Sequence, residues 1–463
     1  MASFQQDQQS GFVQLAQGHD AFAARMMLVE NAVSTLDIQY YIWEYNLTGR
    51  LLFEALVRAA ERGVAVRLLL DDNNTARLDQ VLARLQAVDG IDIRLFNPMR
   101  NRRFRLLNYV TDFHRVNRRM HNKSLTADEQ ASIIGGRNIG DAYFNAGRGL
   151  YFIDLDVLVT GAIVRDISAD FDKYWSCPSS LPVGEVMGSR MKQLQNRPNR
   201  DTSILDSDPE ARAYLNSLKQ SPYGSTLSQL DVEKTQAQLI SDDPAKGAGK
   251  EQKVLMQHRL SQLSATPEKE LLLVAPYFIP GRWGTDYFKR LRRQGVEICV
   301  LTNAFEATDV PIVHTGYRKY RKKLLKAGVR IYELKQSAGN PTGRSPDLSI
   351  TGRSRASLHA KTFSIDREKV YVGSHNFDPR STHLNTEMGA LIDSRELAEG
   401  TATIFEETVP PASYEVRLGK DGKLEWIERS EGEIKIHQRE PGMAWYHKIW
   451  IYLVSKLPIE WLL

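Results

Sequence analysis

Two stretches of this chain carry the same residue types at the same spacing. From a histidine, a lysine follows at +2, an aspartate at +7, small residues at +14 and +15, and an asparagine at +17. The two copies are His121, Lys123, Asp128, Gly135, Gly136 and Asn138, and His359, Lys361, Asp366, Gly373, Ser374 and Asn376. A single His-x-Lys pair is commonly an exposed surface pair, whereas two copies with identical offsets predict a functional site.

These residue types suit a phosphodiester. Residues at i and i+2 of a strand point to the same face, so we predict that each histidine projects beside its lysine. If the copies pack about a pseudo-two-fold axis, both pairs converge, and two positive charges face one tetrahedral anion. The small residues would let the backbone approach this ligand, and Asn138, Asn376 and Ser374 would hold its phosphoryl oxygens.

Two histidines at such a site can divide the reaction between them. A neutral imidazole attacks phosphorus and forms a covalent phosphohistidine. The other imidazole, protonated, gives its proton to the departing alcohol and later takes one from the acceptor alcohol. Lysines and asparagines would stabilise the equatorial oxygens, so we expect neither a metal ion nor a cofactor.

Carboxylates are expected to orient the two imidazole rings. Asp154 and Glu387 stand at corresponding strand starts downstream of the two motifs, although each could also be an ordinary carboxylate at a strand edge. Asp128 and Asp366 complete the motifs but fall at expected turns. An aspartate at a turn stabilises local structure through hydrogen bonds or an ion pair, so we expect these two to hold the motif rather than the substrate.

The motifs follow two copies of one larger unit. Residues 36–72 and 271–305 each read as an apolar strand, a loop, an amphipathic helix and a second apolar strand. Gly63 and Gly295 stand where each helix would end in a left-handed residue. The sequence therefore predicts an α/β fold of two repeats, with mixed β-sheets flanked by helices.

The rest of the chain divides around these repeats. We expect the first repeat at 1–190, a polar connecting region at 191–253, the second repeat at 254–410, and an extension at 411–463 that begins with a charged hairpin. The composition is that of a globular protein, and the two cysteines form neither a disulfide nor a zinc pattern. A net charge of +5 slightly favours anionic partners. We expect no signal peptide and no membrane span.

The duplicated motif resembles that of the phospholipase D superfamily. Over residues 15–393, strings such as RMHNKS, GGRNIGDAYF, SLHAKTFSID and NFDPRSTHLNTEMG are similar to bacterial cardiolipin synthases, especially their C type. This resemblance implies that the active site comprises His121, Lys123, Asp128, His359, Lys361 and Asp366. It favours His121 as the nucleophile and His359 as the general acid and base, an assignment that the near-identical motifs themselves leave open.

The resemblance also implies a reaction and a place. The expected activity is transfer of a phosphatidyl group to phosphatidylglycerol by a peripheral protein of the bacterial inner membrane. The donor is phosphatidylethanolamine in the C type and a second phosphatidylglycerol in other members. The expected partners are these phospholipids and an anionic membrane surface, without nucleic acid.

Two rival functions use the same residues. A nuclease or other hydrolytic phosphodiesterase would share the motif, and basic clusters at 100–105 and 318–326 would suit a nucleic-acid backbone as well as anionic lipid. A catalytically inactive lipid-binding protein is the other rival. It would need no paired nucleophile and acid, so the intact motifs argue against it.

The C-terminal tail is expected to contact lipid. Over residues 445–457, Trp445, Ile449, Trp450 and Leu453 share one face of an expected amphipathic helix that ends before Pro458. A tryptophan-rich amphipathic helix fits the bilayer interface. A helix packed on the protein's own core would show the same periodicity, so this alternative stays open.

Overall fold

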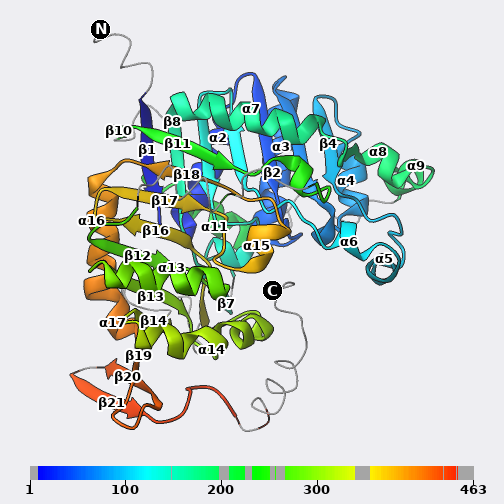
Figure 1. Ribbon diagram of the computed structural model, residues 1–463. Helices are drawn as coiled ribbons and strands as arrows, with labels where there is room; N and C mark the ends of the chain where they lie inside the picture. The colour runs from blue at the N-terminus through cyan, green and yellow to red at the C-terminus, as the bar shows by residue number, and fades with distance from the viewer. Residues whose placement is uncertain are drawn as a thin grey trace.

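Two large mixed sheets, each flanked by helices, form the molecule (Figure 1). The computed structural model describes residues 9–147, 149–197, 208–224, 232–250, 256, 266–338, 355–430, 432–444 and 446. In Figure 1 the first sheet is blue to green and the second is green to red. The predicted α/β class, with mixed sheets in two repeats, is confirmed.

The first sheet has the strand order β10-β1-β8-β6-β5-β2-β3-β4-β9. Its strands are β1 (Ser10–Leu15), β2 (Thr35–Tyr40), β3 (Ala65–Asp71), β4 (Ile91–Phe96), β5 (Ser124–Ala127), β6 (Ala131–Gly135), β8 (Asp156–Gly161), β9 (Ser180–Pro182) and β10 (Glu233–Thr235). The associated helices are α2 (Gly18–Asn31), α3 (Leu47–Glu61), α4 (Asp79–Leu85), α5 (Arg105–Thr111), α6 (Phe113–Val116), α7 (Ala162–Ser176), α8 (Val183–Met187), α9 (Arg190–Gln195) and α11 (Pro209–Leu218), with the 3-10 turns η1 (Asp72–Asn74) and η2 (Asp141–Tyr143).

The second sheet has the strand order β11-β18-β17-β16-β12-β13-β14-β19-β20-β21. Its strands are β11 (Ala237–Ser241), β12 (Glu270–Val274), β13 (Glu297–Asn303), β14 (Arg330–Leu334), β16 (Lys361–Ile365), β17 (Lys369–Gly373), β18 (Met388–Ile392), β19 (Ser413–Leu418), β20 (Leu424–Ser430) and β21 (Glu433–His437). Its helices are α13 (Gly281–Arg293), α14 (Pro311–Lys326), α15 (Pro379–His383), α16 (Arg395–Thr403) and α17 (Val409–Ala412), with the 3-10 turn η4 (Pro244–Lys246) and the π-helical turn η5 (Ile404–Thr408).

The strand orders match between the repeats. The run β1-β8-β6-β5-β2-β3-β4-β9 of the first sheet corresponds in order to β11-β18-β17-β16-β12-β13-β14-β19 of the second. The predicted strand–helix–strand units are β2-α3-β3 and β12-α13-β13, and both strand pairs are parallel. Gly63 and Gly295 follow their helices with φ of 94° and 92°, the left-handed conformation that a glycine adopts without strain.

The stretch expected to connect the repeats supplies outer strands to both sheets. β10 pairs with β1 of the first sheet, and β11 pairs with β18 of the second. β11 has the place in the second sheet that β1 has in the first, and its residues 237–241 precede the boundary expected at 254. β19 and β20 form the hairpin expected after residue 411, and they widen the second sheet.

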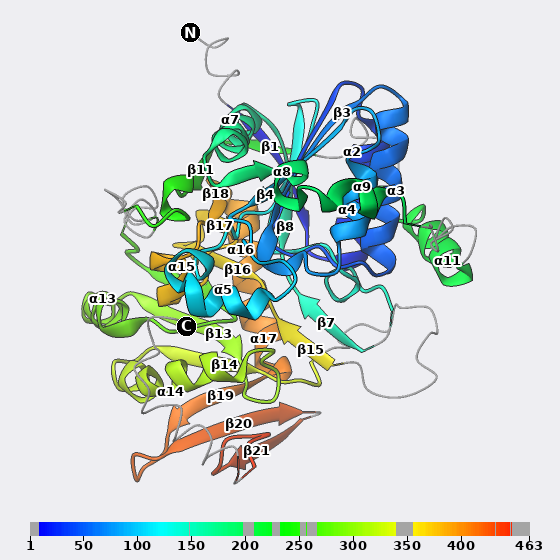
Figure 2. The same cartoon turned by 90° about the vertical axis from the view of Figure 1, so that its right-hand side faces the viewer.

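The two repeats meet along their sheets. Val157 and Val159 of β8 pack in one apolar cluster with Val372 of β17 and Ala390 of β18. A second link is a parallel pair between β7 (Leu150–Ile153) and β15 (Arg355–Leu358), which lie side by side in Figure 2. These contacts determine how the first residues of β5 and β16 face each other, and therefore how the two motif histidines are placed.

The sequence predicted four membrane-contact residues in the tail. Trp445, Ile449, Trp450 and Leu453 lie outside the described residues. Within the part of the chain that the structure describes, no helix combines the length and the apolar character that crossing a bilayer requires.

Candidate active site

Each histidine lies where one repeat meets the other. The sequence predicted each histidine on a strand with its lysine, and this is wrong, because β5 begins three residues after His121 and β16 two residues after His359. The backbone N–H of His121 donates to the carbonyl of Thr386 over 2.9 Å, and that of His359 donates to the carbonyl of Ile153 over 2.8 Å. Each histidine thus pairs with the opposite repeat instead of continuing its own sheet.

Each imidazole also contacts a carboxylate from the opposite repeat. Nδ1 of His121 lies 2.7 Å from Oε2 of Glu387, and Nδ1 of His359 lies 2.5 Å from Oδ2 of Asp154. All four side chains are buried. A carboxylate at Nδ1 orients the ring and leaves Nε2 as the nitrogen that can act on a substrate. The two carboxylates that the sequence indicated therefore lie beside the histidines, and each contacts the histidine of the other repeat.

The two lysines are buried next to these rings. Nζ of Lys123 donates to the carbonyl oxygen of His121 over 2.6 Å. Lys361 donates to the carbonyl oxygen of His359, and its Nζ lies 3.0 Å from Nδ1 of that ring. Burial lowers the pKa of Lys123 to about 7 and also lowers the pKa of Lys361. Buried ammonium groups are costly to keep charged without a counter-charge, so the site favours an anion.

Burial sets the charge of the histidines in the same way. The pKa of His121 falls to about 4, because burial outweighs the attraction of Glu387. Burial likewise lowers the pKa of His359. Burial alone would raise the pKa of Glu387, but the adjacent His121 brings it to about 2, and His359 similarly holds the pKa of Asp154 below its usual range. An arriving phosphodiester anion would raise the histidine pKa values and allow one ring to be protonated.

The two motif aspartates hold strands in place. Asp128 and Asp366 follow the far ends of β5 and β16, away from the histidines. The carboxylate of Asp128 accepts hydrogen bonds from the backbone N–H groups of residues 33–35, and that of Asp366 from those of residues 268–270. These contacts fix the turns that enter β2 and β12. Their position agrees with the expectation of a structural role, and it does not place them among the reacting groups.

The other expected phosphate ligands are partly engaged within the protein. Oδ1 of Asn138 accepts a backbone N–H, and its Nδ2 donates to the hydroxyl of Tyr143 over 2.9 Å. Ser374 donates to Oε2 of Glu387 over 2.5 Å, so it orients a carboxylate rather than a phosphate. Oδ1 of Asn376 is buried without a hydrogen-bond partner among the described residues.

The glycine at the same motif position as Ser374 makes room for the other carboxylate. A Cβ atom at Gly136 would lie 2.1 Å from Oδ1 of Asp154. The sequence predicted that this small residue would let a ligand approach the backbone. Approach of a ligand stays a prediction, whereas the contact with the carboxylate that orients His359 already requires a residue without a Cβ atom at position 136.

Aromatic side chains contact both imidazoles, and the sequence analysis did not predict them. The ring of Tyr41 meets His121 edge-on at 5.1 Å between centroids. Phe152 and Tyr143 lie 5.1 and 5.2 Å from His359. The only signal for Tyr41 was its position in the Tyr-Tyr pair at the end of β2. Apolar walls exclude water and strengthen the electrostatic interactions inside the site.

This arrangement can bind and cleave a phosphodiester. Lys123 and Lys361 supply positive charge, and the two imidazoles supply a nitrogen nucleophile and a proton donor. Within the described ranges, no group of three or more histidine, cysteine, aspartate or glutamate side chains is placed to hold a metal ion.

The comparisons with known proteins identify the family. The family model described as "Cardiolipin synthase, PLD-like domain" matches the chain twice, over residues 26–175 and 260–409. These spans contain both motifs and cover more than half of the chain. The chain therefore belongs to the cardiolipin synthase family of the phospholipase D superfamily, and it is a phosphatidyltransferase of that type.

Individual relatives agree with this assignment. Cardiolipin synthase C of Escherichia coli strain K12 is 45% identical over 458 residues, which cover 98% of this chain and 96% of that protein. Cardiolipin synthase 1 of Staphylococcus epidermidis is 25% identical over 90% of this chain and 72% of its own length. The crystal structure of a phosphatidylserine synthase from Haemophilus influenzae shares the fold, with a TM-score of 0.61 over 100% of this chain and 99% of that one at 13% identity.

Proposed function

We propose that this chain makes cardiolipin from phosphatidylethanolamine and phosphatidylglycerol through a phosphohistidine on His121. The observation that carries the proposal is the pair of buried imidazoles, each with its own carboxylate and lysine. In the first step Nε2 of His121 attacks phosphorus, the bond to the ethanolamine oxygen breaks, and His359 protonates that oxygen. In the second step His359 takes the proton from the phosphatidylglycerol hydroxyl, whose oxygen attacks phosphorus and releases Nε2.

The acceptor in this proposal is an alcohol rather than water. The aromatic rings beside His121 and His359 support that choice, because ring surfaces next to the reacting groups leave fewer positions for water. The choice of phosphatidylethanolamine as donor rests on the likeness of the motifs to C-type synthases. A hydrolytic phosphodiesterase would follow the same first step and use water in the second.

The test uses mixed vesicles of phosphatidylglycerol and phosphatidylethanolamine with an isotopic label in the ethanolamine headgroup. We expect one free ethanolamine for each cardiolipin formed, measured by mass spectrometry. Cardiolipin formed equally fast from phosphatidylglycerol alone, with glycerol released, would transfer the donor role to phosphatidylglycerol. Phosphatidic acid in place of cardiolipin would make the protein a hydrolase, and nicking of plasmid DNA would favour the nuclease.

We also infer that the protein binds anionic membranes peripherally, partly through α5. Leu106 and Val110 of this helix are 82% and 81% exposed, and the preceding Phe104 is 62% exposed. Neighbouring exposed apolar side chains mark interaction surfaces, and an amphipathic segment of this kind fits a lipid interface.

The basic cluster at 100–105 contributes less free charge than its sequence indicates. Arg102 is buried in ion pairs with Asp72 and Asp79, and Arg105 donates to the backbone carbonyl of Asp72. These two arginines fix the segment before α5 to the protein. The apolar residues, with exposed Arg100 and Arg103 beside them, are therefore the part of this segment that faces outward.

Replacing both Leu106 and Val110 with aspartate is expected to weaken binding to vesicles that contain phosphatidylglycerol by about tenfold or more. The reason is that two apolar side chains can no longer move from water into the bilayer interface. Turnover on detergent-dispersed lipid should change less than twofold. Vesicle flotation measures the binding. The matched control replaces both Ile434 and Ile436 of β21 with aspartate, since these are also two exposed apolar side chains. Unchanged flotation of the double variant would contradict the α5 contact.

A further inference from the structure

The second repeat encloses an apolar cavity of about 230 Å³ beside the active site. Its walls are the facing surfaces of β12, β16 and α13, closed by the segment that leads into α15. The apolar lining includes Leu271, Leu273, Trp283, Tyr287, Phe288 and Phe363.

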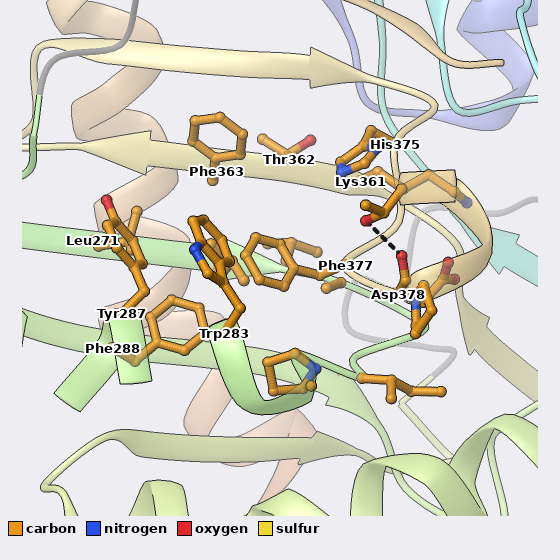
Figure 3. Close-up of a pocket in the computed structure, with 18 of the residues that line it drawn as sticks. Leu271, Trp283, Tyr287, Phe288, Lys361, Thr362, Phe363, His375, Phe377 and Asp378 are labelled. Carbon is orange, nitrogen blue, oxygen red and sulfur yellow. Dashed lines mark hydrogen bonds between the residues drawn. The ribbon is translucent and has the colours of Figure 1, made fainter. Parts of the chain in front are cut away.

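Three polar residues of the lining lie at one end of the cavity. Figure 3 shows Lys361, His375 and Asp378 at that end, and Leu271 and Tyr287 at the other. Lys361 is the lysine that contacts the His359 backbone and ring. Lys361 therefore borders both the cavity and the site that we propose for the phosphate.

Strand alternation explains why one surface carries both a charge and an apolar wall. Lys361 and Phe363 are two residues apart on β16, so they point to the same face. On α13, Trp283 and Tyr287 are four residues apart, and their rings stack at 5.6 Å between centroids. Trp283 is half-exposed, so its indole forms the rim of the cavity while the deeper wall is buried.

His375 lies at the polar end of the cavity, beside Lys361. It lies between Ser374 and Asn376, and its Nδ1 is buried without a hydrogen-bond partner among the described residues. Burial lowers the pKa of this imidazole to about 4, so the ring is neutral at pH 7. A neutral imidazole can donate a hydrogen bond to an uncharged ester carbonyl without bringing a charge into the apolar part of the cavity.

We propose that this cavity binds a fatty acyl chain of the phosphatidyl group that is transferred, with His375 beside its ester and the phosphate at Lys361. A phosphatidyl group has the same polarity sequence as the cavity, an anion followed by esters and then hydrocarbon. The proposal rests on the proposed function for the identity of this ligand. In this proposal the second repeat recognises the acyl chain of the donor. The duplicated motif contacts only the phosphate and does not provide that recognition.

The experiment compares donors of different chain length. Phosphatidylethanolamines with two chains of 6, 8, 10 or 18 carbons are presented in one detergent, and release of ethanolamine is measured. For the unmodified protein we expect kcat/KM to rise with chain length. Leu273→Phe fills the cavity and should lower kcat/KM at least tenfold for the 18-carbon donor, but less than twofold for the 6-carbon donor.

The matched control is Leu272→Phe, which makes the same change at the next residue of β12. Leu272 packs in a different apolar cluster from Leu273, on the other face of the strand. Thermal melting establishes that each variant is folded. Should Leu273→Phe fail to fold, Trp283→Ala at the half-exposed rim replaces it, with the same selective loss expected for long chains.

Three results would overturn the acyl-chain site: an equal loss for all chain lengths, no loss for any, or the same chain-length pattern in the Leu272→Phe control. Failure of the proposed function is seen separately. In that case ethanolamine or another headgroup is released with a chain-length dependence, but no cardiolipin forms from phosphatidylglycerol.

Discussion

Replacing His121 with alanine is expected to lower cardiolipin synthesis by at least about a thousandfold and to prevent any covalent phosphatidyl-enzyme, because the attacking nitrogen is gone. Replacing His359 with alanine should slow turnover by a similar factor but leave the nucleophile. A donor with a 4-nitrophenol leaving group needs little protonation. With that donor, the His359→Ala protein should accumulate a long-lived adduct on His121, detected by mass spectrometry after denaturation.

The control for this pair is His19→Ala, since His19 is a partly exposed histidine of α2 that bonds to Ser217. We expect it to keep normal turnover. An adduct on His359 in the His121→Ala protein would exchange the two roles. Absence of an adduct from both variants, with turnover retained, would rule out a covalent phosphohistidine.

The second large effect is expected at Glu387 and Asp154, the two carboxylates that contact the histidine of the opposite repeat. Glu387→Gln and Asp154→Asn should each lower kcat by a factor on the order of 10²–10⁴, because an amide neither fixes the same imidazole tautomer nor stabilises the imidazolium. The two changes are nearly isosteric, so the buried packing is retained. Asp170→Asn serves as the control, because Asp170 is a buried carboxylate of α7 that bonds to Ser241.

The pH profile separates positioning from a loss of structure. In kcat/KM, which reports the free enzyme, the acid limb should fall near pH 4, where His121 becomes protonated and stops being a nucleophile. The alkaline limb should lie below pH 6.5, the ordinary histidine value, because burial lowers the pKa of His359, which must be protonated. Loss of a neighbouring negative charge lowers an imidazole pKa.

Each carboxylate variant should therefore move a different limb. Glu387→Gln should shift the acid limb to lower pH and leave the alkaline limb in place. Asp154→Asn should shift the alkaline limb to lower pH and leave the acid limb. The opposite assignment of limbs would mean that His359 is the nucleophile, and a uniform loss at every pH would indicate a structural role only.

Much of the fold and the chemistry could be predicted from the sequence. The strand–helix–strand units at 36–72 and 271–305 were visible because apolar periodicity and a terminal glycine are local signals. The identical offsets from His121 and His359 indicated a two-fold phosphodiester site, because duplication makes coincidence improbable. Asp154 and Glu387 could be named as candidates because they occupy corresponding places after the two motifs.

Other features were decided only by the way the sheets pack. His121 and Glu387 are 266 positions apart, and His359 and Asp154 are 205 apart, so no local pattern states that the pairs cross. Backbone hydrogen bonds between the repeats also pair each histidine with the opposite repeat, so that neither histidine lies on a strand of its own sheet. The cavity beside Lys361 likewise depends on the distance between α13 and its sheet. Periodicity reveals which face of an element is apolar, but burial, pKa values and cavities arise from contacts between distant segments, which only the tertiary structure specifies.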